Sequence, residues 1–517
     1  MKKIFILLPI LYFGKVTAQD SLNNQWNKIE FEKTFLKHQI PLYLERFDTI
    51  NLGNSTVNYF TRNNKFKDVY TAKKSEGFNV QSERFVTVKD WKFYGKFSFS
   101  KYEEKQTGFT AMANPYRDNP YKIADSTTNA DWKKQHYLLD AQILTPEFAK
   151  NLKAGVGIKY EILNGARQID PRPSDKLVDI EITPQFVYQF NNWQFGGNGY
   201  YNHFREDLMI EMENIQQPKN IYKSLGLGEY LYNNPIVTSS SSALNRTYNA
   251  NNYGGGITVG NQFNTNNFFQ FSASYKKVNE KAIDGTTNPY NAGEHTQNIL
   301  SGILTYQYNR GHYNHIVSLE GNRADIENRE FVQSLNTTTE QFEQVYNAIM
   351  HYQLKNSIAL NYGLQITNNQ QTVWNLGVGA IYNYNDQQYP TTQSRMETES
   401  YVLNALKRWF NIKNVNVALG YQTTYKANAD NMLRYNADPN FTNFVANSIL
   451  YPNFAFNNTN YWANQLDVQV TLPTFRNWNS QLYFKVNYQN IYSIQEYLNH
   501  NKGLSNNYFN FTIGLLN

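Results

Sequence analysis

The stretch Val178–Phe190, with the sequence VDIEITPQFVYQF, decides the fold of this chain. Apolar residues and proline occupy every second position, at Val178, Ile180, Ile182, Pro184, Phe186, Tyr188 and Phe190. The positions between them carry Asp179, Glu181, Thr183, Gln185 and Gln189. Because successive side chains of a strand point to opposite faces, this segment has one apolar and one polar face. Its length exceeds the roughly 5–6 residues of an ordinary strand and suffices to cross a bilayer at the tilt of a barrel strand.

The same alternation recurs along most of the chain. In the segment 91–99, Trp91, Phe93, Phe97 and Phe99 alternate with Lys92, Tyr94, Lys96 and Ser98. Further copies occupy residues 137–143, 154–162, 269–275, 300–308, 358–366, 374–384, 415–421, 462–472, 482–488 and 509–515. These repeats predict an all-β fold, a single transmembrane antiparallel β-barrel of about 18 strands (range roughly 16–20) over residues 66–517.

The connections between these segments alternate between short and long. Asn191-Asn192 and Arg310-Gly311 read as tight turns, which belong on the periplasmic side of such a barrel. The longer connections, expected outside the cell, are residues 104–132, 164–176, 207–251, 280–295, 385–395, 426–460 and 492–505. Residues 326–356 are compatible with one strand or two, and residues 66–73 with a first strand or none.

The composition fits a barrel better than a soluble protein. The chain holds 40 Tyr, 33 Phe and 8 Trp in 517 residues, although its mean hydropathy is only −0.64. Aromatic rings at both membrane interfaces and a polar lumen give this combination. The absence of cysteine excludes a disulfide scaffold, a cysteine metal site, a thiol nucleophile and a lipid-attachment cysteine. Of the formal net charge of +6, Lys2, Lys3 and Lys15 supply half, so the charge does not indicate a nucleic-acid partner.

The N-terminus reads as a secretory leader. Lys2 and Lys3 precede the apolar run Ile4–Phe13, and Val16-Thr17-Ala18 offers a small-residue cleavage site. Residues 1–18 are therefore predicted to be a cleaved signal peptide, which implies export and location in the cell outer membrane as a multi-pass barrel. The apolar run is too short for a membrane anchor, and no later run of about 18 apolar residues predicts a transmembrane helix.

Residues 19–65 are predicted to be an N-terminal periplasmic segment. Apolar residues recur there at roughly helical spacing, at Leu22, Trp26, Ile29, Phe31, Phe35 and Leu36. The pattern is compatible with a short helix that lies on or plugs the periplasmic mouth, and with a partly ordered tail.

The first third of the barrel carries the most distinctive motifs. They are Glu83-Arg84-Phe85, Trp91-Lys92-Phe93-Tyr94-Gly95, Asn119-Pro120-Tyr121 with Ile123-Ala124-Asp125, and the run from Gly165 to Pro173. In these motifs and in layout the chain resembles an uncharacterised family of outer-membrane β-barrels of the Bacteroidota, catalogued as a domain of unknown function. The resemblance implies localisation and architecture, and it brings no substrate, cofactor or catalytic residue.

The candidate site residues fall into three groups. The polar strand faces place six charged side chains in the lumen, Lys92, Lys96, Lys159, Glu161, Asp179 and Glu181. In the loop Asp170-Pro171-Arg172-Pro173, Asp170 and Arg172 could contact the lumen, or the loop could be a rigid external one. The aromatic residues expected at the lipid interface are Trp91, Phe99, Tyr188, Phe190, Trp193, Trp374, Tyr382 and Trp462.

The sequence gives little support for catalysis or metal binding. It has no Gly-x-Ser-x-Gly or His-Glu-x-x-His motif, and His312 and His315 would face opposite sides of a strand. The oxygen-rich stretch Asn428–Asp438 lacks the ligand spacing and the bidentate Glu of a calcium loop. We therefore predict no enzyme, no catalytic residue, no metal and no cofactor.

Three functional hypotheses follow from these observations. The first is a porin-like channel or a solute-binding and uptake protein whose polar lumen takes a small hydrophilic solute. The second is a non-conducting accessory or structural subunit of a larger outer-membrane receptor or secretion complex, since the Tyr- and Asn-rich loops suit contacts with other outer-membrane proteins or lipoproteins. The third, a soluble secreted β-protein, leaves the many long strands with interface aromatics unexplained. The expected partner of the barrel wall is outer-membrane lipid.

Overall fold

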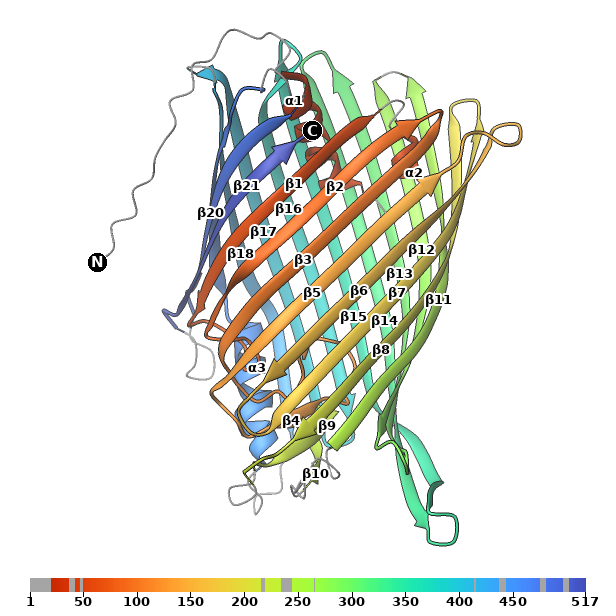
Figure 1. Ribbon diagram of the computed structural model, residues 1–517, viewed down its shortest axis with the longest axis vertical. Helices are drawn as coiled ribbons and strands as arrows, with labels where there is room; N and C mark the ends of the chain where they lie inside the picture. The colour runs from red at the N-terminus through yellow and green to blue at the C-terminus, as the bar shows by residue number, and fades with distance from the viewer. Residues whose placement is uncertain are drawn as a thin grey trace.

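The computed structural model describes residues 20–36, 42–46, 50–214, 219–233, 244–264, 266–412, 415–436, 443–474, 480–495 and 502–517. Eighteen strands form one antiparallel sheet in which β1 pairs with both β2 and β21, so the sheet closes on itself. Figure 1 shows the resulting barrel of tilted strands. The strands are β1 (Asn51–Asn64), β2 (Lys74–Val88), β3 (Trp91–Thr107), β5 (Ala130–Leu144), β6 (Leu152–Arg167), β7 (Arg172–Phe190), β8 (Trp193–Glu211), β11 (Leu244–Asn264), β12 (Asn267–Asp284), β13 (Tyr290–Arg310), β14 (Tyr313–Asn336), β15 (Gln341–Asn368), β16 (Gln371–Tyr389), β17 (Thr392–Ile412), β18 (Val415–Tyr435), β19 (Tyr461–Thr471), β20 (Gln481–Ser493) and β21 (Ser505–Leu516). The predicted fold class and strand number are confirmed.

The two ends of the barrel differ in their connections. At one end lie the chain segments before β1 and after β21, together with mostly short turns such as 191–192, 311–312 and 369–370. At the other end lie the long connections, among them 108–129, 212–243 and 436–460. By the usual layout of bacterial barrels, the end with the short turns faces the periplasm and the other faces outward.

The outside of the barrel carries a continuous apolar belt. Each of the 18 strands contributes at least one large apolar or aromatic side chain that is more than a third exposed. On β7, the strand quoted above, Ile182, Phe186 and Phe190 are 40%, 52% and 54% exposed, and no second sheet or helix of the described chain covers this row. Because a closed barrel leaves no unpaired sheet edge and such a belt is stable only in lipid, the protein is an outer-membrane β-barrel.

A helical segment lies inside the periplasmic end. It comprises α1 (Asp20–Phe35) and α2 (Leu42–Glu45), and we refer to residues 20–36 and 42–46 as the N-terminal helical segment. Buried residues of this segment form one apolar cluster with the inner faces of β1, β2, β3, β5, β7, β20 and β21. In the described part of the chain, no helix combines the length and apolar character needed to cross a membrane.

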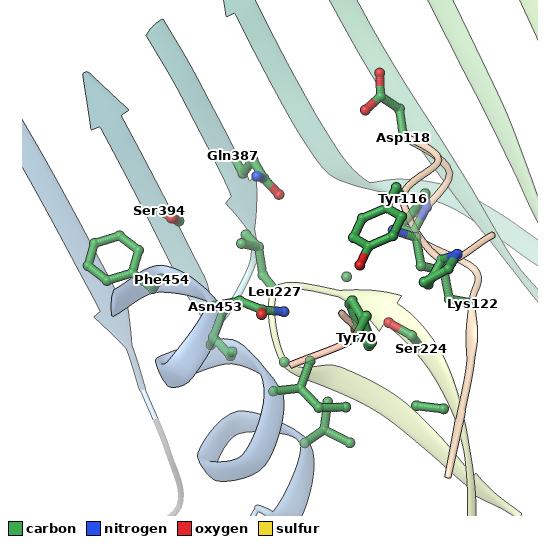
Figure 2. A pocket seen from close by; sticks show the side chains of 18 of the residues that line it. Tyr70, Tyr116, Asp118, Lys122, Ser224, Leu227, Gln387, Ser394, Asn453 and Phe454 are labelled. Carbon is green, nitrogen blue, oxygen red and sulfur yellow. The ribbon is translucent and has the colours of Figure 1, made fainter. Parts of the chain in front are cut away.

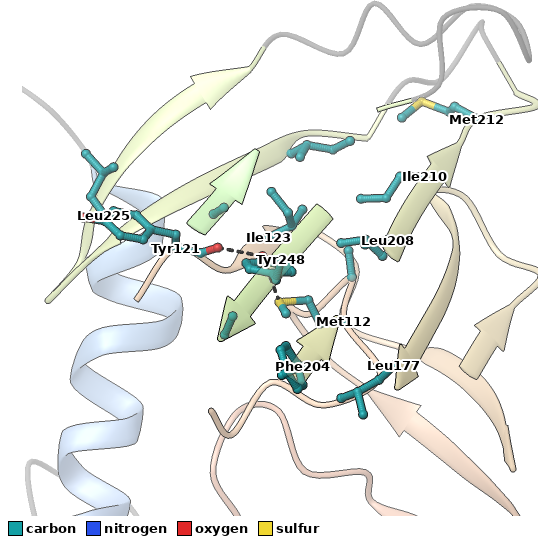
Figure 3. Packing of buried hydrophobic residues seen from close by; sticks show 14 residues of the cluster. Met112, Tyr121, Ile123, Leu177, Phe204, Leu208, Ile210, Met212, Leu225 and Tyr248 are labelled. Carbon is teal, nitrogen blue, oxygen red and sulfur yellow. Dashed lines mark hydrogen bonds between the residues drawn. The ribbon is translucent and has the colours of Figure 1, made fainter. Parts of the chain in front are cut away.

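The outer end is filled by connections that fold together. Residues 108–129, which we call the inserted loop, contain β4 (Ile123–Asp125). This strand pairs with β9 (Ile221–Gly226), which in turn pairs with β10 (Glu229–Asn233). The π-helix η2 (Ala446–Leu450) and α3 (Tyr451–Asn458) pack beside this small sheet (Figure 1). Figure 3 shows the inserted loop, through Met112, Tyr121 and Ile123, packed on the inner face of β7, β8 and β11.

Several sequence-based boundaries are wrong. The barrel begins at Asn51 rather than at residue 66, because β1 pairs along its length with β2 and β21. Residues 66–73 form the connection after β1, and residues 326–356 form the two arms of the β14–β15 hairpin. Much of the predicted loops 207–251, 280–295 and 426–460 is strand that extends beyond the apolar belt. Polar extensions of this kind carry no lipid-facing row, so the alternation that identified the strands is absent from them.

Candidate functional site

The inner wall carries a ladder of opposite charges. In strand register, Glu83 lies opposite Lys96 and Lys96 opposite Asp140. Asp140 in turn lies opposite Lys159, and Lys159 opposite Glu181. These residues belong to the five neighbouring strands β2, β3, β5, β6 and β7, so positive and negative side chains alternate across this part of the wall. Opposite charges at paired positions stabilise a sheet by about 0.2–1 kcal/mol per pair.

The other predicted lumen residues have defined partners. The Nζ atom of Lys92 donates to the carbonyl oxygen of Glu45 in α2 at 3.0 Å. Glu161 lies 3.1 Å from Lys159 and 2.9 Å from the ring of His136. Asp179 accepts a hydrogen bond from the amide of Asn202. The six predicted side chains thus lie on inner faces, where they mostly contact one another and the N-terminal helical segment.

Asp170 and Arg172 lie at the outer rim and hold two connections together. Asp170 accepts hydrogen bonds from the side chain of Arg172 at 2.9 Å and from the backbone nitrogen of Asn214 at 2.7 Å. Arg172 also forms an ion pair of 2.5 Å with Glu213. The structure therefore places both residues in contacts with the connection after β8, the arrangement of a rigid external loop.

The eight predicted interface aromatics lie on outer faces. Trp91, Phe190 and Trp193 flank periplasmic turns and are 41%, 54% and 39% exposed. The hydroxyl of Tyr382 donates to Glu397 at 2.9 Å, where the outer surface becomes charged. The remaining four residues are Phe99, Tyr188, Trp374 and Trp462; of these, Phe99 packs on Tyr137 and Trp374 lies under Lys407.

The N-terminal helical segment bridges opposite walls of the barrel. Lys33 of α1 forms an ion pair of 2.6 Å with Glu83 on β2. On the other side, Asn24 accepts a hydrogen bond of 2.8 Å from the backbone of Thr372 at the start of β16. Beyond α1, Glu45 lies 2.5 Å from Lys153 on β6 and 3.4 Å from Lys92 on β3. The segment therefore spans the lumen from one wall to the other.

Close packing on β14 and β15 fixes the far side of α1. Phe31, Phe35 and Ile316 form a buried apolar cluster. A Cβ atom added to Gly363 would lie only 2.3 Å from the ring of Phe35. Glycine at this position therefore lets the helix approach the wall.

Buried charges hold the inserted loop at the other end. Arg167 and Asp125 form an ion pair of 2.5 Å, and their side chains are 1% and 0% exposed. Arg167 also donates to the carbonyl oxygens of Thr110 at 2.9 Å and Pro171 at 2.8 Å. The remaining donors of this guanidinium are thus largely satisfied, as a buried ion pair requires.

Further anchors fix the middle of the inserted loop. Arg117 pairs with Glu206 on β8 and with Glu280 on β12. Arg246 pairs with Asp284 at 2.6 Å and donates to the carbonyl oxygen of Tyr121 at 3.0 Å. A Cβ atom on Gly293 would lie 2.3 Å from the ring of Tyr121, so the loop lies directly against β13.

Two of the cavities lined by described residues lie in the lumen. The outer cavity, of about 350 Å³, lies between the inserted loop, the β9–β10 turn, α3 and the inner faces of β15, β16 and β17. Figure 2 shows Tyr116 and Lys122 on one side of it and Asn453 and Phe454 of α3 on the other. The inner cavity, of about 390 Å³, lies between α1 and the inner faces of β16–β20. Its wall combines apolar residues with several amide side chains, for example Asn375, Asn404, Asn416, Gln422 and Gln469.

The sequence did not reveal these cavities. The inserted loop was predicted to be an external loop, yet it supplies Arg117, Asp118 and Lys122 to the outer cavity. The sequence feature that could have indicated its location is the pair of distinctive motifs at 119–125 and 165–173. In the structure these motifs are joined by the ion pair between Asp125 and Arg167. No sequence pattern predicted that residues of α3 line the cavity, because their positions depend on a connection that folds back into the barrel mouth.

The oxygen-rich stretch Asn428–Asp438, predicted to be part of a loop, begins within a strand. Asn428, Asp430 and Asn431 lie within β18, and Asp430 pairs with Arg395 at 2.9 Å. Asp438 lies outside the described residues. Among the residues that the structure describes, no group of three or more His, Asp or Glu side chains could hold a metal ion.

These features define an 18-stranded outer-membrane β-barrel with a partly filled lumen. Within this class the chain belongs to the family of unknown function DUF6850, whose model matches residues 41–517. The membership agrees with the resemblance to an uncharacterised barrel family. The predicted signal peptide lies outside the described residues and stays a prediction.

Comparisons with other proteins find low similarity. No curated protein matches the sequence. The chain is similar to the FrpB iron transporter from Neisseria meningitidis, with a TM-score of 0.39 and 8% identity over 92% of this chain and 83% of that one. It is also similar to the ferric citrate transporter FecA (TM-score 0.40, 10% identity, 90% and 79% coverage). For the copper transporter OprC the values are 0.39, 8%, 90% and 81%.

Proposed function

We propose that the protein is an uptake barrel for a small hydrophilic solute, and that its N-terminal helical segment is a releasable plug. The solute would enter the outer cavity, move along the amide-rich wall of β15–β19 and leave through the inner cavity. The observation that carries this proposal is the position of α1, which crosses the lumen but leaves a cavity of about 390 Å³ beside it. A segment that served only to fill the periplasmic mouth would be expected to close it on all sides.

The contacts of the plug support release rather than permanent closure. Within the described residues the plug precedes β1, so the strand that follows it in the chain is its one described covalent connection to the barrel wall. Its wall contacts combine two apolar clusters, one with seven strands and one with Ile316, with ion pairs such as Lys33–Glu83 and Glu45–Lys153. Each such contact contributes a modest free energy, so a shift of the segment breaks a limited number of interactions.

Solute flux into liposomes tests this proposal. The purified barrel and a variant that lacks residues 20–46 would be reconstituted, and liposome swelling in a neutral sugar would be followed. We expect slow swelling for the intact protein and fast swelling for the deletion variant. Heat-modifiable migration in gels would verify that the variant remains a folded barrel, which is expected because the deletion removes no strand. Equal, negligible flux through two folded barrels would contradict the proposal.

One observation favours an accessory role as a second function. The β14–β15 hairpin projects beyond the outer mouth (Figure 1). It exposes Val332, Leu335, Val345 and Tyr346 by 58%, 48%, 66% and 62%. Exposed apolar groups on a projecting hairpin favour contact with another outer-membrane protein. Gentle-detergent purification of the intact protein and of a variant with Val345 and Tyr346 replaced by Ser tests this role, since a real partner should be retained by the first and lost from the second.

A further inference from the structure

The outer cavity contains a lysine whose charge is not used. Among the described residues, the Nζ atom of Lys122 has no hydrogen bond or ion pair, although Lys122 lines the cavity. The other charged groups of the wall are occupied. Asp118 pairs with Lys355, Arg117 pairs with two glutamates, and Asp68 accepts hydrogen bonds from Thr71 and from the backbone of Tyr70. Lys122 thus forms no ion pair in the described part of the cavity, and among the other described charged groups of the wall the Asp68 carboxylate also forms none, since hydrogen bonds hold it without neutralising its charge.

The backbone holds Lys122 in place on both sides. Its nitrogen donates to the carbonyl oxygen of Pro120 at 2.7 Å, and its carbonyl oxygen accepts from the nitrogen of Ser224 at 2.8 Å. The next residue, Ile123, begins β4, which pairs with β9. A binding residue held in this way loses little conformational freedom when a ligand binds.

The rest of the wall suits a hydroxylated ligand. Tyr70 and Tyr116 offer ring faces, and Tyr116 is 58% exposed toward the open space. Gln353, Asn385, Gln387 and Asn453 supply amide donors and acceptors. A cavity of about 350 Å³ lies at the lower end of the size range of small-molecule sites.

A second unpaired cation lines the inner cavity. Arg408 on β17 is 7% exposed, and its Nη1 atom is buried without a hydrogen-bond partner. No carboxylate of the described chain forms an ion pair with it. A cation without an ion pair therefore lines each of the two cavities, outer and inner, through which the solute of the proposed function would pass.

We infer that the outer cavity binds a small hydroxylated carboxylate, such as a sugar acid, with its single negative charge on Lys122 and its hydroxyl groups on the amide side chains. This inference rests on the proposed function, because it names the class of solute that the uptake barrel would take. A dianion such as phosphate is a poorer match, since only one cation of the described outer wall is free.

Isothermal titration of the full-length protein in detergent tests this inference without any need for transport. The probes are glucuronate, neutral glucose and inorganic sulfate. We expect saturable binding of glucuronate, at least about tenfold weaker binding of glucose, and no displacement of glucuronate by sulfate. In the variant Lys122→Gln, glucuronate affinity should fall by at least about tenfold, whereas Lys219→Gln, at an exposed position outside the cavity, should leave it unchanged.

The pH dependence gives an independent readout. Burial lowers the pKa of Lys122 to about 8, an effect that the neighbouring Arg117 and Lys355 reinforce and Asp118 opposes. Lys122 is therefore charged below pH 8, and affinity for glucuronate should fall as the pH rises from about 7 to about 9.5. Asp68, Asp118, Arg117, Lys355 and His351 also face the cavity, so the comparison with Lys122→Gln, whose affinity should not change over this interval, isolates the lysine.

Each outcome decides the inference. Absence of glucuronate binding, or equal binding by the native protein and Lys122→Gln, would overturn it. Displacement by sulfate at similar concentration would show a general anion site and overturn the assignment to a sugar acid. None of these binding results depends on whether the deletion opens the lumen, so the inference and the proposed function can fail separately.

Discussion

The two mouths of the barrel are filled by different means. At the periplasmic end, the N-terminal helical segment contacts the wall through apolar side chains and a few ion pairs, such as Lys33–Glu83, whose side chains are 19% and 7% exposed. At the outer end, the inserted loop is joined to strands on both sides and is held by the fully buried pair Arg167–Asp125 and the pair Arg246–Asp284. Breaking a fully buried pair costs about 3–5 kcal/mol, and a pair in which one side chain keeps contact with solvent, as Lys33 does, costs less. The difference indicates that the inserted loop and the small sheet β4–β9–β10 form a fixed outer frame, whereas the N-terminal helical segment is a releasable plug in the periplasmic mouth.

The largest effect is expected when the outer frame is broken. Arg167→Met leaves the Asp125 carboxylate buried without its partner and removes two donors to backbone carbonyls. The local stability of the inserted loop should fall by about 3–5 kcal/mol. Limited proteolysis of the reconstituted protein would measure this, with cleavage expected within residues 108–129.

A double variant sharpens that prediction. Arg167→Met combined with Asp125→Leu removes both charges and should recover part of the lost protection, because an unpaired buried charge is the main cost. Proteolysis of the single variant at the native rate would mean that the pair does not hold the loop.

A smaller effect is expected at the plug. Gly363→Ala places a methyl group 2.3 Å from the ring of Phe35 and should displace α1 from β15. Overpacking of this kind costs about 1–3 kcal/mol. Glucose flux into liposomes should increase.

The matched control is Gly321→Ala on the neighbouring strand β14, where an added Cβ meets no atom within 4 Å. The control should behave like the native protein. If both variants raise the flux equally, the effect belongs to strand flexibility rather than to the plug.

The smallest effect is expected from the ion pair between α1 and β2. Glu83→Gln removes the charge that Lys33 contacts at 2.6 Å and should loosen the plug by about 1 kcal/mol. Because salt screens a largely buried pair only weakly, raising NaCl from about 0.1 M to about 1 M should raise glucose flux in the native protein only slightly and have less effect in the variant. The same salt response in both proteins would assign it to other charges.

The sequence predicted the barrel wall well because lipid imposes a strict rule on it. Each crossing strand must present an apolar row outward, so the alternation at Val178–Phe190 and its repeats was sufficient to give the fold and the strand number. This rule does not apply to the parts of a strand that lie outside the lipid. The first strand, with the sequence LGNSTVNYF over Leu52–Phe60, carries a short outward row and was assigned to the N-terminal segment instead.

The lumen could be predicted only in part. Strand alternation indicates that Lys159 and Glu181 face inward, but it does not indicate their opposite positions in register, which depend on how the strands are staggered. The inserted loop has the polar composition of an external connection. Its place inside the barrel follows from the contact of Asp125 with Arg167, 42 residues later in the chain, and such contacts are not visible in local sequence patterns.

Hydrogen exchange of the intact protein in detergent or nanodiscs tests the contrast between the two mouths most directly. Backbone amides of α1 should exchange at least about a hundredfold faster than the paired amides of β4 and β9 in the outer mouth, because the ion pairs of the plug keep more contact with solvent than the pair Arg167–Asp125 does. Slower exchange in α1 than in this small outer sheet would show that the plug is the fixed element, and would contradict the claim that the periplasmic mouth opens more readily than the outer one.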